Sequence, residues 1–302
     1  MKILLLGKNG QLGWELQRSL QPLGSVIALD RHRSVDGYCG DVSDFSAIEY
    51  ALQQIHPNVV VNAAAYTAVD QAEIEPKQAD LINHLAVAHL AQQCQQLNIL
   101  LIHYSSDYVF AGGGDVAWQE SDLPSPQNVY GMTKRNGEIA LERSGVHFIN
   151  MRTSWVYGVH GHNFIKTMLK LAKQQDQLKI VNDQIGAPTA AALIADVTAQ
   201  VLRYYYLQSV HQQAQLHGHY HLAASGAVSW YEYAHYIFEQ ACALGMSLQL
   251  KQVHAVATAD YPTPAKRPLN SRLNTQKLQQ QFQLYLPPWQ QGVKHVLGEI
   301  RI

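Results

Sequence analysis

Three regularly spaced glycines near the start of the chain constrain its fold more than any other feature. Gly7, Gly10 and Gly13 follow directly after the apolar run Ile3–Leu6, with the spacing G-x-x-G-x-x-G. Glycine permits a tight turn and a close approach of backbone N–H groups to a phosphate, and the N-terminus of a following helix adds partial positive charge. Such glycines also occur in ordinary strand–helix turns. The strand before them and the helical pattern after them predict the pyrophosphate-binding turn of a dinucleotide site.

Short apolar runs alternate with longer segments of helical spacing through the first half of the chain. We expect strands at residues 2–7, 25–30, 58–65, 99–106 and 147–154. We expect helices at residues 11–21, 44–54, 76–97 and 129–143. Strands that are apolar along their whole length, separated by helices, indicate an α/β fold with a parallel, doubly wound (Rossmann) sheet covered on both faces. Its ligand crevice lies beyond the carboxyl ends of the strands.

The alternation becomes less regular after about residue 155. Helices are expected at residues 163–174, 191–206 and 229–243, with a short strand at 218–223. We therefore predict an NAD(P)-binding Rossmann domain over residues 1–155, to which residues 185–212 also belong. A smaller, discontinuous C-terminal domain, formed by residues 156–184 and 213–302, is expected to bind the substrate.

The composition is that of a globular protein, because 47% of the 302 residues are hydrophobic and 15% are charged. A net charge of −1 argues against nucleic acid and anionic membranes as partners. The three cysteines are far apart, and no apolar stretch has the length of a signal peptide core or a membrane span. We expect a soluble, cytoplasmic protein.

Two other patterns have simple explanations. His217, His219 and His221 alternate along an expected strand and share one face, but no carboxylate or cysteine completes a metal site. Tyr204–Tyr206 end an expected helix without a basic surface beside them, which favours partial burial over stacking on nucleic acid. No metal site is predicted.

Asp30 ends the second expected strand and bears on the choice of cofactor. A carboxylate at this place accepts hydrogen bonds from the adenosine ribose and disfavours a 2′-phosphate, which favours NADH. Arg31 and Arg33 follow at once and either pair with such a phosphate or lie in a solvated turn. We therefore predict that both NADH and NADPH are used. Small residues at 63–65 leave room for a cofactor, although they are also compatible with tight packing.

A second constellation is typical of proton transfer to a carbonyl. Tyr130 and Lys134 are four residues apart at the start of an expected helix and so lie on one face. A nearby ammonium is expected to lower the pKa of the phenol, which makes it a usable general acid–base. Ser106, at the end of the fourth strand, can hydrogen-bond the same substrate oxygen. A lone Y-x-x-x-K pair is common by chance, but its combination with the glycine turn and this hydroxyl is specific, and we predict Ser106, Tyr130 and Lys134 as the catalytic residues.

With these residues the chain resembles the extended short-chain dehydrogenase/reductase family, over nearly its whole length. The resemblance rests on GKNGQLGWELQ at residues 7–17, VNAAAYTAVDQAE at 61–73, HYSSDYVF at 103–110, VYGMTK at 129–134, RTSWVYG at 152–158, NDQIGAPT at 182–189 and YPTPAKRPLNSRLN at 261–274. It implies an NAD(P)H-dependent oxidoreductase that reduces a 4-keto sugar carried on deoxythymidine diphosphate (dTDP).

The resemblance also implies roles for individual residues. It gives the pyrophosphate to Gly10, Gln11 and Leu12, and the ribose to Asp30. It places around the cofactor Asp41, Val42, Ala65, Tyr66, Thr67 and Tyr104, together with Tyr130 as proton donor and Lys134 as its modulator and a ribose anchor. It assigns the sugar nucleotide to Ser106, Asp107, Trp155 and Arg267.

Two departures from the family pattern bear on these expectations. The family often has threonine where this chain has Ser106, which keeps the hydroxyl. Some relatives resemble magnesium-linked dimers held by acidic side chains, and here Glu15 is retained while Ala192 and Gln290 stand at the other two places. A monomer is therefore favoured over a homodimer. A sugar-nucleotide epimerase or dehydratase and a non-catalytic regulatory subunit remain as alternatives.

Overall fold

The computed structural model describes residues 1–300, and its centre is a six-stranded, parallel β-sheet. The strands are β1 (Lys2–Leu6), β2 (Ser25–Leu29), β3 (Val59–Asn62), β4 (Leu100–Ser106), β5 (Phe148–Thr153) and β10 (Gly218–His221). They lie in the order β10-β5-β4-β3-β1-β2, which reverses direction between β1 and β3. This is the doubly wound arrangement, so the prediction of fold class is confirmed.

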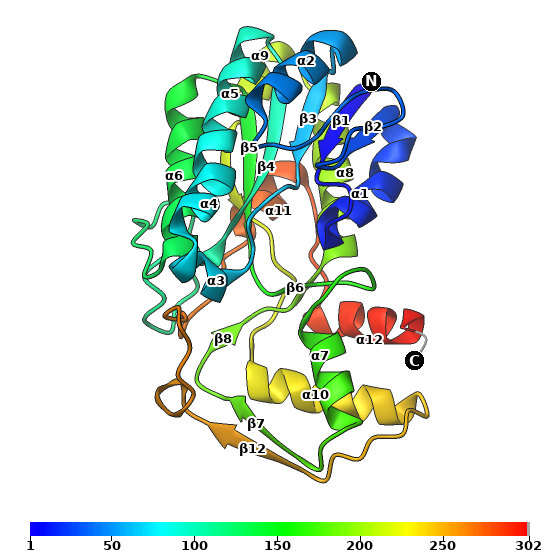
Figure 1. Cartoon of the computed structure of the whole chain (residues 1–302), viewed down its shortest axis with the longest axis vertical. Helices are drawn as coiled ribbons and strands as arrows, with labels where there is room; N and C mark the ends of the chain where they lie inside the picture. Colours follow the sequence, from blue (N-terminus) through cyan, green and yellow to red (C-terminus); the bar gives the residue numbers. More distant parts are fainter. Residues whose placement is uncertain (301–302) are drawn as a thin grey trace.

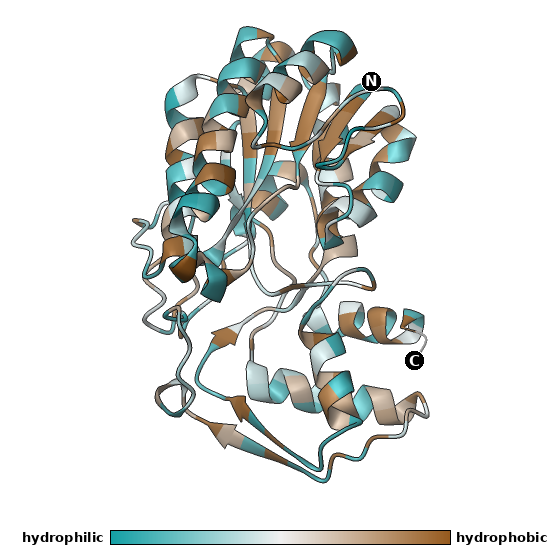
Figure 2. Ribbon diagram, in the orientation of Figure 1, coloured by the Kyte–Doolittle hydropathy of each residue, from teal (hydrophilic) through white to brown (hydrophobic). Residues whose placement is uncertain are grey.

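Alternating side chains of the strands build one apolar layer on each face of the sheet. Ile3 and Leu5 pack with α1 (Gln11–Leu20) and α8 (Ala191–Leu207), whereas Leu4 and Leu6 pack against α2 (Phe45–Ile55) and α5 (Ala86–Gln96). Next to α5, α6 (Val129–Ser144) completes the second layer. Figure 1 shows the sheet between these helices, and Figure 2 shows that its strands are apolar along most of their length. The strands are buried on both sides, as a parallel sheet requires.

The helix predicted over residues 76–97 is interrupted, and that prediction is wrong in detail. The segment forms α4 (Pro76–Asp80), a π-helical turn η2 (Leu81–Leu85) and then α5. The turn carries Asn83, whose side chain hydrogen-bonds both backbone groups of Tyr66 and donates to the Thr133 hydroxyl of α6. π-Helical turns are frequent beside functional sites. Here the turn ties the loop after β3 to the helix that carries Tyr130. A further short helix, α3 (Val69–Ile74), was not expected from the sequence.

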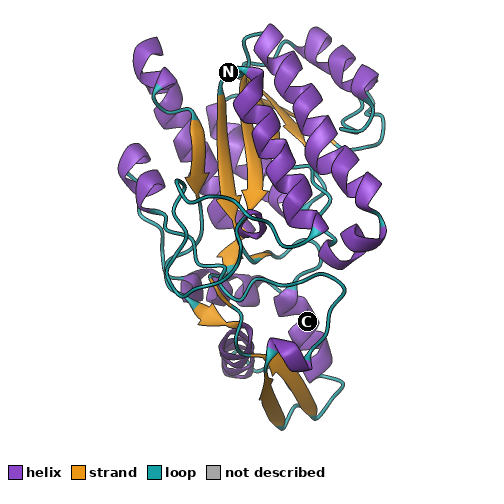
Figure 3. Ribbon diagram, turned by 90° about the vertical axis from the view of Figure 1, so that its left-hand side faces the viewer, coloured by secondary structure: helices purple, strands orange, loops and turns teal. Residues whose placement is uncertain are grey.

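A smaller lobe lies beyond the carboxyl ends of the strands (Figures 1 and 3). Its helices are α7 (Phe164–Ala172), α10 (Trp230–Ala243) and α12 (Trp289–Glu299). Its strand pairs are β7 (Gln177–Val181) with β12 (Gln252–Val256), β6 (Val156–Tyr157) with β9 (Thr189–Ala190), and β8 (Ile185–Gly186) with β11 (Val228–Ser229). A separate cluster of buried residues, rich in aromatic side chains, forms its core. The other short elements are η1 (Gln21–Leu23), η3 (Asp107–Val109), α9 (Val210–Ala214), η4 (Thr258–Asp260) and α11 (Gln276–Phe282).

Two segments of the expected second domain pack with the first. β10 pairs with β5 in the central sheet, and Leu278 and Phe282 of α11 join the cluster that covers one face of that sheet. We therefore propose that the cofactor domain comprises residues 1–155 and about 185–212, extended by β10 and α11, and that the remaining segments form the substrate lobe. None of the helices within residues 1–300 combines the length and the apolar character needed to cross a membrane.

Candidate active site

A cleft of about 1080 Å³ lies between the carboxyl ends of the strands and the smaller lobe. All the residues predicted for catalysis and for the substrate line it, namely Ser106, Asp107, Tyr130, Lys134, Trp155 and Arg267. Of the predicted cofactor residues, its walls contain Gly10, Gln11, Leu12, Ala65, Thr67 and Tyr104, besides Tyr130 and Lys134. The structure thus brings residues from both halves of the chain into one cavity.

The glycine turn forms one end of the cleft and fits an anionic group. A Cβ atom on Gly13 would collide with the carbonyl oxygen of Gly7, so glycine is required for α1 to approach the turn. Gly7 itself has a φ of +85°, which favours glycine. Gly10 precedes α1 and has no side chain that caps the helix, so the first N–H groups of α1 are left for a ligand. These features match a pyrophosphate site.

The remaining predicted cofactor residues lie outside the walls of the cleft. Gly7 and Gly13 shape the turn, and Asp30 accepts hydrogen bonds from Asn9 Nδ2 at 2.8 Å and from the His32 backbone N–H at 2.7 Å. The His32 hydrogen bond lowers the pKa of the Asp30 carboxyl, with a smaller contribution from Lys8. The carboxylate is therefore ionised and stands at the edge of the turn.

Asp41, Val42 and Tyr66 also have partners within the protein. Asp41 accepts hydrogen bonds from the backbone and the hydroxyl of Ser43, and Val42 belongs to an apolar cluster beneath the sheet. The Tyr66 hydroxyl donates to Glu75 at 2.8 Å. Contact of these three side chains with a cofactor stays a prediction.

The proton-transfer residues come from β4 and α6. Asn128 caps α6 by accepting a hydrogen bond from Gly131 N–H at 2.8 Å, and a Cβ atom on Gly131 would collide with the Tyr108 carbonyl. The helix can therefore begin close to the end of β4, which brings the Tyr130 ring edge-on to the Tyr108 ring at 5.4 Å between centroids. One turn further, Lys134 is 2% exposed and its Nζ donates to the Tyr104 carbonyl at 2.6 Å.

The predicted direction of the Tyr130 pKa shift is wrong. Burial raises the pKa of the Tyr130 phenol above its ordinary value, and a contact with Ser106 opposes this increase in part. Burial likewise lowers the pKa of the Lys134 ammonium to about 8. The reason is that both groups are removed from water, and the Lys134 ammonium is directed to the Tyr104 carbonyl and not to the phenol. A phenol that keeps its proton at neutral pH is a proton donor.

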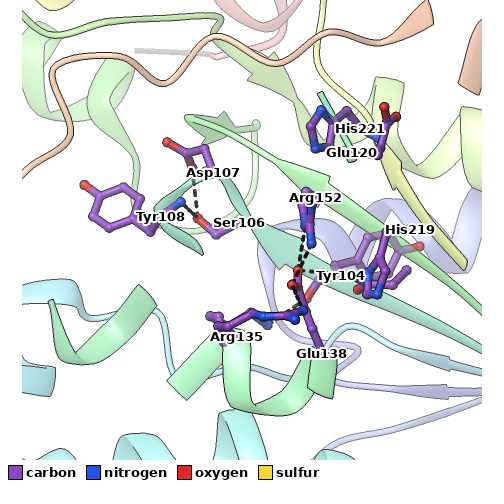
Figure 4. A network of polar contacts seen from close by, with 12 residues as sticks. Tyr104, Ser106, Asp107, Tyr108, Glu120, Arg135, Glu138, Arg152, His219 and His221 are labelled. Atoms are coloured by element: carbon purple, nitrogen blue, oxygen red, sulfur yellow. Dashed lines mark hydrogen bonds and ion pairs between the residues drawn. The ribbon is translucent and has the colours of Figure 1, made fainter. Parts of the chain in front are cut away.

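Ser106 is connected to a buried carboxylate. Its hydroxyl donates to Asp107 Oδ1 at 2.8 Å and accepts a hydrogen bond from Tyr108 N–H (Figure 4). Asp107 is 2% exposed, and within residues 1–300 its Oδ2 has no hydrogen-bond partner. Burial raises the pKa of Asp107 to about 6. An unpaired acceptor in the wall of the cleft matches a ligand that offers a hydroxyl group.

The substrate side of the cleft has an aromatic wall and a cation. Trp155 adopts a φ of +48°, which is unusual for a bulky residue, and its ring stacks on Trp230 with 3.6 Å between centroids. Arg267 forms an ion pair with Asp70 at 2.6 Å and donates to the Tyr108 hydroxyl at 3.3 Å. The guanidinium is thus held at the cleft by two residues of the first domain.

With this geometry in view, the comparisons with known proteins identify the family. The family model described as RmlD substrate binding domain matches residues 1–302. The dTDP-4-dehydrorhamnose reductase of Escherichia coli K12 is 51% identical over 300 residues, which are 99% of this chain and 98% of that relative. The chain belongs to the RmlD substrate binding domain family.

Solved structures of other members have the same fold. The dTDP-4-dehydrorhamnose reductase of Bacillus anthracis, crystallised in complex with NADP, is 32% identical, with a TM-score of 0.85 and 99% of each chain covered. A dTDP-4-dehydrorhamnose reductase from Clostridium acetobutylicum is 32% identical, with a TM-score of 0.88 and all of both chains covered. UDP-glucose 4-epimerase of Thermus thermophilus, at 18% identity and a TM-score of 0.78, shares the fold.

Several residues at the cleft of this RmlD family member were missed in the sequence. The segment after β6 reaches the glycine turn, where His160 Nε2 lies 3.0 Å from the Asn9 carbonyl and its ring stacks on Trp14. Asn163 Nδ2 donates to Gln11 Oε1 at 3.0 Å. Only Gly158 and Gly161, which flank this segment, hint at a turn there. Asp70 and Tyr108 lie within quoted motifs, but nothing in their spacing shows that they hold Arg267.

Proposed function

We propose that this protein reduces the 4-keto group of dTDP-4-dehydro-β-L-rhamnose, which yields dTDP-L-rhamnose for cell-surface polysaccharide synthesis. The observation that carries the proposal is the 51% identity to the E. coli dTDP-4-dehydrorhamnose reductase over nearly the full length of both chains. The cleft supports it, because Ser106, Tyr130 and Lys134 line a single cavity with the glycine turn.

NADPH or NADH, when bound, supplies the hydride that reduces carbon 4 of the sugar. The N-terminus of α1, with Gly10, Gln11 and Leu12, would hold its pyrophosphate. Asp30 offers an ionised carboxylate to the ribose, and the exposed Arg31 and Arg33 offer charge to a 2′-phosphate. The B. anthracis relative was crystallised with NADP, which supports use of the phosphorylated cofactor beside NADH.

The protein's own residues supply the proton and stabilise the developing charge. Tyr130 holds its proton because burial raises the pKa of the phenol, and it gives this proton to the substrate oxygen as that oxygen gains negative charge. The Ser106 hydroxyl would turn its proton from Asp107 to the same oxygen and so provide a second hydrogen bond, and Lys134 adds a buried positive charge. The fixed geometry of β4 and α6 provides proximity.

The other end of the substrate would lie between the two lobes. Asp107 Oδ2, which is buried near the Ser271 hydroxyl and has no hydrogen-bond partner within residues 1–300, would accept a hydrogen bond from a sugar hydroxyl that reaches it, and the Trp155 ring forms an apolar wall for the sugar. Arg267 would pair with the diphosphate, in part at the expense of its contact with Asp70. These assignments give each substrate group a partner of complementary chemistry.

A coupled assay tests the proposal. The sugar substrate is generated in place by the two enzymes that precede this step, NADH or NADPH is added, and the product is identified by chromatography. Stoichiometric oxidation of the cofactor with formation of dTDP-L-rhamnose is expected. An epimerase or dehydratase would consume no cofactor, and a non-catalytic subunit would form no product, so either result refutes the proposal.

We further propose that the protein acts as a monomer in the cytoplasm. Glu15 lies 3.4 Å from Arg18 in a surface pocket that also contains Asp196 and Glu299, and Ala192 stands in this pocket at a place where the resemblance implies an acidic side chain in magnesium-linked dimers. Light scattering with and without Mg²⁺ tests the assignment. A monomer mass in both conditions is expected, and a dimer that depends on Mg²⁺ contradicts it.

A further inference from the structure

A buried ion pair lies on the same helix as the proton-transfer residues, and the proposed reaction gives it no role. Glu138 of α6 is fully buried and accepts two hydrogen bonds from Arg152 of β5, each 2.8 Å long. Arg152 is itself 2% exposed. Figure 4 shows the two side chains facing each other, with Arg135 on the other side of the carboxylate. Arg135 donates to Glu138 at 3.1 Å.

The energetics of burial do not explain this pair. Removing two charges from water costs about as much as their attraction returns, and a well-packed apolar pair of similar size is often equally or more stable. The position of Glu138 suggests another reason. It follows Lys134 by four residues, so the two side chains lie on one face of α6, one turn apart.

Lys134 needs a counter-charge. It is 2% exposed, and its hydrogen bond is to the neutral carbonyl of Tyr104. Its ammonium forms no ion pair at salt-bridge distance in the described part of the chain, residues 1–300. Only two carboxylates are buried in that part, Asp107 and Glu138, and Asp107 bonds Ser106. Glu138 is therefore the buried negative charge available to Lys134 from its own helix.

The other charged and titratable groups nearby do not replace it. From β4, His103 is buried and its pKa is far below the ordinary value, so it is neutral, and Tyr104 is a neutral phenol. From β10, His219 Nε2 lies 3.0 Å from the Glu142 carboxylate. Glu142 lies on the half-exposed side of α6, where it also binds Arg135. Tyr130 is protonated, and Arg152 adds further positive charge.

We propose that Glu138 is a positioning residue for proton transfer: its carboxylate, fixed by Arg152 and Arg135, is the buried counter-charge that keeps Lys134 charged beside Tyr130. The role given to Lys134 rests on the proposed reductase function. The charge state of Lys134, however, can be measured without any substrate.

Loss of the Glu138 charge is expected to lower the pKa of Lys134, because burial and this charge act on that pKa in opposite directions. Burial lowers the pKa of Lys134 to about 8, and the Glu138 charge opposes that decrease. Without this charge the pKa falls further, and removal of a close opposite charge shifts a pKa by about 1–3 units. Lys134 then loses its proton at lower pH, and the decline of activity on the alkaline side moves to lower pH with it.

Three variants separate this role from a structural one. Glu138→Gln removes the charge but leaves Arg152 buried and unpaired, which is expected to destabilise the fold. Glu138→Gln combined with Arg152→Met removes the whole pair and avoids that cost. Glu142→Gln, on the same helix but half-exposed, is the matched control.

Two readouts are measured on each folded variant. The titration of Lys134 is followed by NMR with lysine labelled at Cε, and its signal is assigned by its loss in Lys134→Arg. The pH profile of kcat/KM is recorded in the reductase assay. We expect Glu138→Gln to lower both the Lys134 midpoint and the alkaline limb of the pH profile by about one pH unit or more. The double variant also loses the positive charge of Arg152 and should lower both by a smaller amount, and Glu142→Gln should leave both unchanged.

A contrary result is equally clear. If either Glu138→Gln or the double variant folds and keeps the Lys134 midpoint of the unmodified protein, Glu138 is only structural and the inference is wrong. If neither Glu138→Gln nor the double variant folds, Glu138→Asp, which keeps the charge, is measured instead. A Lys134 midpoint within about 0.3 pH units of that of the unmodified protein supports the inference. A decrease of the midpoint by about one pH unit or more overturns it. Absence of sugar reduction by the unmodified protein refutes the proposed function alone, because the NMR midpoint does not depend on substrate.

Discussion

The inner wall of the cleft and the outer edge of the glycine turn are built in different ways. Ser106 and Lys134 are buried, and packing of α6 against β4 fixes their positions. Arg31 and Arg33, after β2, are exposed and follow Asp30, whose carboxylate bonds Asn9 and the His32 backbone at the edge of the turn. Charges act strongly where water is excluded and weakly where it is not. The chemistry should therefore depend on the inner wall by large factors, and the choice of cofactor on the outer edge by small ones.

The largest effect is expected for Tyr130→Phe on the inner wall. Loss of the proton donor should lower kcat by about 10²–10⁴-fold, because general acid catalysis contributes that much. The dissociation constant for NADPH, measured by fluorescence titration, is the control. It should change by no more than about twofold, because phenylalanine keeps the aromatic ring and lacks only the hydroxyl. Turnover close to that of the unmodified protein would remove Tyr130 from the mechanism.

Arg267→Ala is expected to have the next largest effect. Loss of a charge-assisted hydrogen bond to a diphosphate costs about 1.5–3 kcal/mol, which corresponds to an increase in KM for the sugar nucleotide of about 10–150-fold. The turnover number should change little, because Arg267 binds the diphosphate and takes no part in proton transfer. Lys266→Ala, the exposed neighbour, is the control and should leave KM unchanged. Equal effects of the two substitutions would contradict the assignment.

Asp107→Asn tests whether burial in the inner wall destabilises the Asp107 carboxylate, and the free energy of unfolding is the quantity that reports it. Burial raises the pKa of Asp107 to about 6, so the folded protein binds this proton more tightly than the unfolded chain does. The contribution of Asp107 to stability is thus present at low pH and is lost as pH rises through about 6. The asparagine variant should be more stable by about 1–3 kcal/mol at pH 8 and no more stable at pH 4.

Thermal unfolding of both proteins at the two pH values measures this difference. Asp115→Asn, in an exposed loop, is the control and should show no change that depends on pH. The same difference in Tm at both pH values would show that the Asp107 carboxylate is not destabilised by burial.

The smallest effect is expected at the outer edge. Replacing Arg31 and Arg33 together by alanine should raise KM for NADPH by a few-fold and leave KM for NADH unchanged, because exposed ion pairs contribute about 0.2–1 kcal/mol each. Steady-state kinetics with both cofactors measure the ratio. A loss of NADPH use by more than about 100-fold would show that these arginines bind the phosphate in a buried site.

The regular parts of the fold were predictable because one local pattern determined each of them. β1 differs from its expected range by one residue at its end, and β5 by one residue at each end, since apolar runs mark where these strands lie. The π-helical turn was not predictable, because its residues have good helical spacing and only the contacts of Asn83 with Tyr66 and Thr133 explain it.

The site could be predicted where the types of residue determine the chemistry. It could not be predicted where the surroundings of a residue determine it. Glycine spacing and the Tyr130–Lys134 pair indicated the cleft, but the direction of the Tyr130 pKa shift depends on burial, which no local pattern reports. The Glu138–Arg152 pair joins residues 14 apart on different elements. The left-handed backbone of Trp155 has no signal at all in its own sequence.

The most direct test of the central claim follows the hydride itself. The protein is incubated with dTDP-4-dehydro-β-L-rhamnose and NADPH that carries deuterium at both hydrogens of nicotinamide carbon 4, and the product is examined by mass spectrometry and NMR. We expect one deuterium on sugar carbon 4, and almost none in the same time with Tyr130→Phe. Product without deuterium at that carbon, or full transfer by the variant, would contradict it.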